Sequence, residues 1–284
     1  MRLQTALVSL LILLCPCALC YGQLRFASVS GDWGYSAIRA SYRADMDNGF
    51  ILIPKYGYYR MSDDEETQDT GSTSRYGLEI LYELHDSLQA LVEGSWQPDA
   101  LGYEGAAYRT GFSWEPFYYF AGIKEPRLTV KFGQERFVSK VDWGGYDLDS
   151  PFKRVATDIL TNMEVNVKRF NLQAAWQKVI KYNSPVPRDV TFTWAELPYM
   201  TAVLQGYIKD AYAVRISYVT QFITPYASIT RFHYDSTSGT SVAVSAGLHI
   251  KLWDADFTGG VEVFEPRRDD ERETYFSLSL DVPM

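Results

Sequence analysis

The chain has 284 residues, with 27 bases and 35 acids, and a formal net charge of −8 at pH 7. This acidic balance argues against nucleic acid as a partner, because nucleic-acid binding requires a basic surface. The three cysteines, Cys15, Cys17 and Cys20, all lie near the N-terminus. The rest of the chain therefore offers no disulfide, reactive thiolate or zinc–thiolate site. No linker or low-complexity run divides the chain, and we expect a single domain.

The N-terminal segment has the order of a secretory signal peptide. Arg2 precedes an apolar run from Ala6 to Leu14, and small residues follow before Gln23. The apolar run is too short to cross a bilayer as a helix. We therefore expect residues 1–22 to be a signal peptide and residues 23–284 to form the mature domain. A retained N-terminal anchor is the alternative.

After this leader, apolar and polar side chains alternate along the chain. Within residues 75–85 every even position is apolar or aromatic, from Tyr76 to Leu84, whereas the odd positions include Glu79 and Glu83. Side chains of a strand alternate between its two faces, so one face is apolar and the other charged. The same pattern predicts strands at about residues 24–33, 35–46, 49–61, 74–85, 87–97, 103–115, 127–138, 158–169, 171–182, 189–197, 200–208, 211–222, 225–235, 241–253, 257–265 and 273–284.

Aromatic residues recur near the ends of these predicted strands. They make up 15% of the chain, and 21 of them are Tyr. Tyr and Trp suit the headgroup level of a bilayer, because each has an apolar body and a polar tip. The mean hydropathy of −0.19 is compatible with a membrane barrel, in which only every second strand residue faces lipid. We predict an all-β, antiparallel, up-and-down transmembrane β-barrel of about 14 strands, within a range of 12 to 16.

The predicted connections alternate between short and long. Short turns with suitable residues are expected at Asp47-Asn48, Asp86-Ser87, Phe170-Asn171, Thr224-Pro225 and residues 254–256. Long polar connections are expected at residues 61–73, 139–157, 183–189, 236–240 and 266–272. With both termini on the periplasmic side, nearly all the short turns fall on that side and the long loops fall outside, which is the asymmetry of bacterial barrels.

The last segment, from Tyr275 to Met284, alternates up to the chain end. Here the sequence resembles the bacterial outer-membrane β-barrel proteins as a class, whose closing strand ends at the C-terminus and is read by the insertion machinery. The class usually finishes on an aromatic residue, whereas this chain finishes on Pro283-Met284. The resemblance is architectural and covers essentially the whole mature chain. It implies the outer membrane of a Gram-negative bacterium as the location.

The same resemblance implies three kinds of partner. Two are outer-membrane lipid, including lipopolysaccharide, and the barrel insertion machinery. The third is a further copy of the chain, since the sequence leaves open whether the protein forms a homo-oligomer.

The three histidines are the candidates for catalysis. His85 lies at a tight turn, whereas parity places His233 and His249 on the polar face of adjacent strands, beside Arg231 and Lys251. The latter two histidines could form a general-base or metal pair, or they could be ordinary polar residues of the lumen. No carboxylate is placed by sequence to orient either ring, and the Ser-Asn-Gly stretch of outer-membrane phospholipases is absent. We predict no enzyme, no catalytic residue, no metal site and no cofactor.

The polar face carries charges of opposite sign in different parts of the chain. Acids gather in the early strands and bases in the late ones, and together with two histidines they form the predicted pore lining: Glu79, Glu83, Glu93, Arg215, Arg231, His233, His249 and Lys251. Acids that face bases across water would create a transverse field that orients polar solutes. Alternatively the acids and bases meet as ion pairs and plug a narrow lumen.

Two classes of function follow from these patterns. We expect a passive pore for small polar solutes. The alternative is a closed-lumen barrel that serves as an anchor, adhesin or assembly component through its outer loops, and an outer-membrane hydrolase is a third hypothesis. The stretch 143–152 either folds inward and narrows a pore or stands outside as a receptor surface.

Removal of the leader can be tested directly. We expect protein extracted from membranes to lack about 22 N-terminal residues, because the apolar run is followed by small residues of the kind that signal peptidases accept. Intact-mass measurement reads the length of the mature chain. Retention of residues 1–22 would support the anchor instead.

Overall fold

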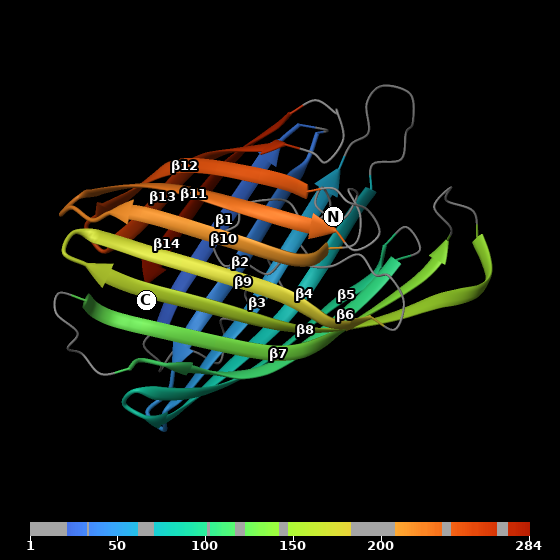
Figure 1. Cartoon of the computed structure of the whole chain (residues 1–284), viewed down its shortest axis with the longest axis horizontal. Coiled ribbons are helices and arrows are strands. Elements are labelled where there is room, and N and C mark those ends of the chain that lie inside the picture. The colour runs from blue at the N-terminus through green and yellow to red at the C-terminus, as the bar shows by residue number, and fades with distance from the viewer. Residues whose placement is uncertain are drawn as a thin grey trace.

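The computed structural model describes residues 22–32, 34–61, 71–100, 103–116, 123–141, 147–182, 208–234, 240–265 and 272–284. These residues form a closed barrel in which each strand pairs antiparallel with its neighbours in the chain (Figure 1). The predicted fold, an all-β, antiparallel, up-and-down barrel of about 14 strands, is confirmed. No helix in the described ranges is long and apolar enough to cross a membrane.

The strands run in chain order around the barrel. Their bounds are β1 Gly22–Gly31, β2 Ser36–Asp45, β3 Phe50–Met61, β4 Gly71–His85, β5 Leu88–Ala100, β6 Tyr103–Trp114, β7 Ile123–Val141, β8 Asp147–Val167, β9 Phe170–Tyr182, β10 Ile208–Tyr218, β11 Ile223–Tyr234, β12 Thr240–Leu252, β13 Ala255–Glu265 and β14 Glu273–Pro283. The predicted strand at 189–197, and all but the last residue of the one at 200–208, lie outside the described residues.

The observed connections differ from the predicted ones in three respects, which involve four connections. The turns that follow β8 and β12 lie at residues 168–169 and 253–254, slightly earlier in the chain than predicted. Lys168 and Trp253 have positive φ values of 56° and 53°, so the tight reversal takes place at these residues. The β10–β11 connection occupies residues 219–222, and Thr224-Pro225 belongs to β11.

The third difference is the β7–β8 hairpin, which takes up most of the predicted loop 139–157. β7 has 19 residues and β8 has 21, and the two remain paired as far as Val141 and Asp147. β9 pairs with β8 only from Ala156 onward. The far part of β8 therefore extends beyond β9, as the long green strands in Figure 1 show.

The barrel closes where its first and last strands meet. β1 pairs with β14 from Gln23 opposite Pro283 to Gly31 opposite Tyr275. The amide of Met284 donates to the carbonyl of Gly22 at 2.8 Å, and the amide of Gly22 donates back at 3.3 Å. Closure leaves no unpaired edge at this seam. Gly22, which we place in the leader by sequence, is the first residue of β1.

The outward face of the barrel is apolar along the middle of the strands. Its exposed side chains include Leu78, Val92, Leu248 and Leu278, of which Leu278 is 67% exposed. The outward parity that we read for residues 76–84 is confirmed, because Tyr76, Leu78 and Tyr82 are exposed whereas Glu79 and Leu81 are buried. This is the wall that a barrel presents to lipid.

Aromatic pairs lie toward both ends of this outward face. At the turn end, ring centroids are 4.5 Å apart in Phe50–Tyr82 and 5.3 Å apart in Phe170–Tyr218. Toward the loop end, Tyr76–Trp96 lie 5.9 Å apart and Trp176–Tyr212 lie 6.4 Å apart. Two such aromatic belts around an apolar band are typical of membrane barrels, because these rings prefer the interface between lipid and water.

The outward face can be tested on β14. We expect Leu278→Arg, in the middle of the strand, to lower the free energy of unfolding by about 2–4 kcal/mol, because a charge near the bilayer centre loses its hydration. Thr274→Arg, on the same face near the loop end, should lower it by about 1 kcal/mol or less. Urea titration of protein folded in lipid vesicles measures both. Equal losses for the two variants would contradict the assignment of this face to lipid.

Candidate functional site

The inner face is identified by side chains that meet across intervening strands. The Lys131 Nζ on β7 lies 3.3 Å from a Glu79 oxygen on β4, and the Arg109 Nη2 on β6 lies 3.2 Å from an Asp158 oxygen on β8. Such contacts are possible only on the concave side of a curved sheet. The residues that share this parity therefore line the interior.

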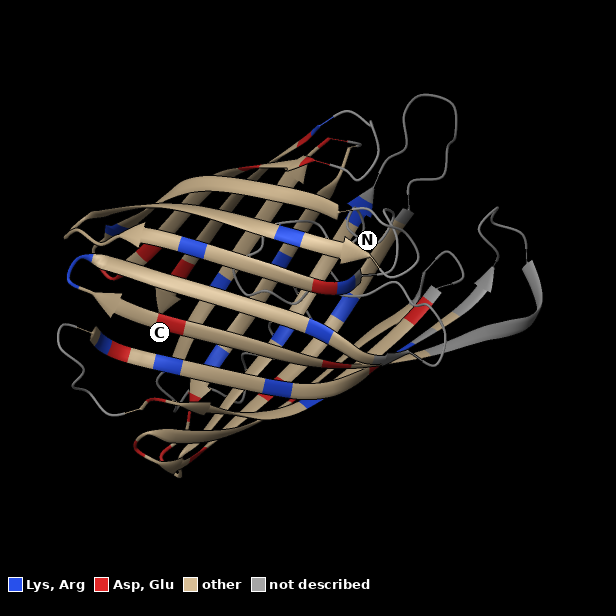
Figure 2. Ribbon diagram, in the orientation of Figure 1, with Lys and Arg blue, Asp and Glu red and all other residues tan. Residues whose placement is uncertain are grey.

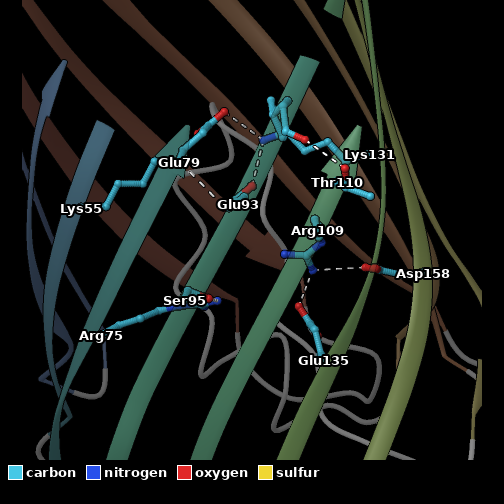
Figure 3. A network of polar contacts seen from close by, with 11 residues as sticks. Lys55, Arg75, Glu79, Glu93, Ser95, Arg109, Thr110, Lys131, Glu135 and Asp158 are labelled. Carbon is cyan, nitrogen blue, oxygen red and sulfur yellow. Dashed lines mark hydrogen bonds and ion pairs between the residues drawn. The ribbon is translucent and has the colours of Figure 1, made fainter. Parts of the chain in front are cut away.

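The interior side of β3–β8 carries a network of ion pairs (Figure 3). We call it the charged network, and its members are Lys55, Glu79, Glu93, Arg109, Lys131, Glu135 and Asp158. It joins three bases to four acids. Figure 2 shows the basic residues as blue bands and the acidic residues as red bands along the tan strands of the barrel.

Two lysines and two glutamates form the first half of this network. Glu79 and Glu93 stand directly opposite each other on β4 and β5, a position in which like charges repel. Lys131 lies 3.3 Å from Glu79 and 2.9 Å from Glu93, and Lys55 pairs with Glu79 and lies 3.8 Å from Glu93. Each carboxylate is therefore shared by two ammonium groups, which removes the repulsion.

Arg109 organises the second half. Its guanidinium pairs with Glu135 and with Asp158, and all three side chains are buried. The Gln177 amide donates to the same Asp158 oxygen at 2.6 Å. Burial strengthens these charge-assisted bonds, but removing one partner would leave a buried charge uncompensated.

Glycines on β6 and β7, the strands that the Lys131 and Arg109 side chains cross, make room for these long cations. Arg109 lies opposite Gly133 on β7, which in turn lies opposite Asp158 on β8. A Cβ at Gly133 would lie 2.4 Å from the Arg109 Cγ, and one at Gly111 would lie 2.9 Å from the Lys131 Cα. Only a residue without a side chain leaves space for these cations to cross the strand.

The interior side of β11–β14 combines large aromatic side chains with small polar ones and two buried glutamates, Glu262 and Glu273. Phe232, Phe264 and Tyr275 on β11, β13 and β14 are less than 2% exposed, and Phe232 and Phe264 meet edge to face at 6.4 Å. We call these three residues the aromatic wall. Ala211, Ala213 and Ala243 surround it. The interior therefore has a side lined by the charged network and a side on which aromatic and polar residues are mixed.

Polar side chains also line the barrel interior nearer its turn end. The Arg215 guanidinium lies 3.7 Å from the ring centroid of Tyr226, and the His249 Nδ1 lies 2.6 Å from the Thr258 hydroxyl. Glu83 and Lys251 are exposed near this end. Six of the eight predicted residues therefore lie on the inner face: Glu79, Glu83, Glu93, Arg215, His249 and Lys251.

The predicted inward orientation of Arg231 and His233 is wrong. Arg231 lies opposite Tyr212 and His233 opposite Asp210, on the face where Tyr212 and Ile229 are exposed, whereas Phe232 between them is fully buried. On β11 the aromatic side chains at 232 and 234 point inward, so the polarity of this segment is reversed. His233 and His249 also lie at opposite ends of the β11–β12 pair and cannot act as a pair.

The predicted partners of the acids differ as well. Glu79 and Glu93 do not face Arg215 and Lys251 across open water; they pair with Lys55 and Lys131 on the neighbouring wall. Sequence reasoning missed Lys55, Lys131 and Arg109. For Lys131 and Arg109, the signal in the sequence was a glycine directly opposite on the neighbouring strand. That position can be recognised only when the strand register is known. The described residues contain no cluster of three or more potential metal ligands.

Comparisons with known proteins bear on the fold. No family model matches the chain, and no curated protein matches it significantly. The CymD monoaromatic hydrocarbon channel matches 93% of this chain and 88% of its own, with 10% identity and a TM-score of 0.50. The Pseudomonas putida toluene transporter TodX matches with the same coverages and identity and a TM-score of 0.47. The outer membrane protein OprD from Pseudomonas aeruginosa covers 93% of each chain at 9% identity, with a TM-score of 0.44. The likeness concerns the barrel fold alone.

The charged network should stabilise the barrel only as a complete set. We expect Lys131→Met to lower the free energy of unfolding by about 3 kcal/mol, because Glu79 and Glu93 are then left with one shared base in a nearly buried site. Arg127→Met, which removes an exposed pair with Glu115, should lower it by less than about 1 kcal/mol.

Urea unfolding in vesicles measures both variants. Adding Glu79→Gln to Lys131→Met should recover part of the loss, since the remaining lysine then pairs with one carboxylate. A loss for Lys131→Met no larger than that for Arg127→Met would show that the network contributes nothing to stability.

Proposed function

We propose that the protein spans the outer membrane of a Gram-negative bacterium and acts as a passive pore for small polar solutes. The observation that carries this proposal is the contrast between the two faces of one closed sheet. The outward face is apolar with aromatic residues toward both ends, whereas the inward face carries the seven charges of the charged network. A polar, charged lining suits the passage of hydrated solutes.

The arrangement of charge supports weak ionic selectivity. The three bases of the charged network are each in contact with acids, and the acids exceed the bases by one. Opposite charges that lie side by side cancel at a short distance, so the field across the lumen is smaller than the number of charges suggests. We infer a slight preference for cations.

A closed barrel that serves as an anchor, adhesin or assembly component is the second candidate. It is favoured by the burial of the aromatic wall, whose side chains are less than 2% exposed near the loop end of the interior. In this case the function would lie in the outer loops. The paired C-terminal strand β14 would suit recognition by the insertion machinery under either proposal.

The contacts of the histidines support a pore over a hydrolase. Within the described residues, His85 contacts Ser87, His249 contacts Thr258, and His233 contacts Asp210 on the outward face. A nucleophilic triad requires one histidine to bond both a hydroxyl and a carboxylate. The contacts of the three histidines therefore favour the pore over a hydrolase that uses such a triad.

Conductance of the purified protein in a planar bilayer tests the proposal. We expect discrete single-channel steps with a weak preference for cations. The triple variant Lys55→Gln/Arg215→Gln/Lys251→Gln neutralises three inward bases. Its reversal potential in a salt gradient should move toward stronger cation selectivity, because the acids are then unopposed. The shift should be largest at low ionic strength, where screening is weak.

Arg231→Gln is the matched control for this experiment, because Arg231 lies on the outward face. Its reversal potential should equal that of the wild type. If well-folded protein gives no conductance above background, the closed barrel replaces the pore as the proposed function.

A further inference from the structure

The charges on the outward face of β9–β11 are confined to the loop end. From the turns to the middle of these strands, the outward residues are apolar, aromatic or proline, such as Leu172, Ile216 and Ile229. Lys178, Asp210, Arg231 and His233 follow on the same face near the loops. A charge on a lipid-facing wall is tolerated near the interface and is costly near the midplane.

These charges form two rows that are fixed by the strand register. Lys178, Asp210 and His233 lie side by side on β9, β10 and β11. The next row toward the turns holds Trp176, Tyr212 and Arg231. We call these six residues the β9–β11 outer surface.

Aromatic rings set the depth of this surface in the membrane. Trp176 and Tyr212 stack with an interplanar angle of 16°, and the Lys178 Nζ lies 5.9 Å from the Trp176 ring centroid. Such rings prefer the interface between lipid and water. Lys178 is two residues beyond Trp176, about 7 Å farther along the strand, which places its ammonium group at the level of lipid headgroups.

The net charge of the surface is positive. The Asp210 carboxylate is hydrogen-bonded to the His233 ring and stands beside Lys178 in the register, so it is already engaged. Lys178 and Arg231 are both exposed. Strand spacing and rise place their Cα atoms about 12 Å apart, a gap that two long cationic side chains can bridge around one anion.

We propose that the β9–β11 outer surface binds a phosphate group of the phosphorylated glycolipid of the outer leaflet, lipid A. Lys178 and Arg231 contact the phosphate oxygens, and arginine can do so with two parallel bonds. Trp176 and Tyr212 pack against the apolar part of the lipid below. The proposal rests on the proposed membrane location but does not depend on whether the lumen conducts.

Binding of lipid A to the purified full-length protein in detergent tests this inference. We expect native mass spectrometry to detect a complex with bis-phosphorylated lipid A, and the same lipid without phosphates to bind at least about tenfold more weakly. The double variant Lys178→Gln/Arg231→Gln should lose a similar factor in affinity. Asp210→Asn should bind more tightly than wild type, because it removes the carboxylate closest to the bound phosphate.

Lys124→Gln is the matched control, because Lys124 is an exposed cation at the turn end of the barrel. The affinity of this variant for bis-phosphorylated lipid A should equal that of the wild type. The two lipids are compared on wild-type protein, so this result does not depend on whether a variant folds. Equal binding of both lipids, or unchanged affinity in the double variant, would overturn the proposal. Single-channel conductance of the double variant should match wild type, so a failure of lipid binding is distinguishable from a failure of the pore.

Discussion

A strand surrounded by lipid can satisfy its backbone hydrogen bonds only through neighbouring strands, because lipid offers neither donors nor acceptors. The seam between β1 and β14, with its reciprocal bonds between Gly22 and Met284, satisfies this requirement by closing the sheet. Closure also separates two environments. Once the sheet is closed, the alternation of side chains along each strand assigns every residue to the wall or to the interior, and all the chemistry of the interior follows from that assignment.

Within the interior, the charged network solves a local electrostatic problem. Glu79 and Glu93 face each other directly, and two lysines compensate them, Lys55 from the adjacent strand β3 and Lys131 from the more distant β7. Compared with apolar residues of similar size, a complete set of such ion pairs adds little net stability, because each charge also loses hydration, whereas the loss of one partner is costly. The network also sets the composition of the wall, which is charged on β3–β8 and mixed aromatic and polar on β11–β14. The two sides of the lumen are therefore chemically different surfaces held on one rigid sheet.

Sequence reasoning predicts the barrel well and its interior only in part. On β4 the two faces differ sharply in polarity, so the inward position of Glu79 is correct. On β11 the rule fails, because Phe232 and Tyr234 point inward while Arg231 points outward near the loops. Local polarity does not distinguish an interfacial arginine from an interior one. The cations of the charged network are harder still to predict, since Arg109 reaches Asp158 across Gly133, and this contact depends on the register of three strands.

The length of the β7–β8 hairpin has a consequence for recognition outside the barrel. At Asp147 and over residues 152–155, β8 pairs with β7 on one side, with an irregularity between these two positions, and β9 joins it on the other side only from Ala156. Among the described residues, the backbone of this stretch therefore has a strand neighbour on one side only. Nine residues of strand span about 30 Å, and an exposed edge of that length is a template on which another extended chain can add a strand. Within the described ranges, the sheet that closes at the β1–β14 seam therefore has an unpaired strand edge on β8 at its far rim.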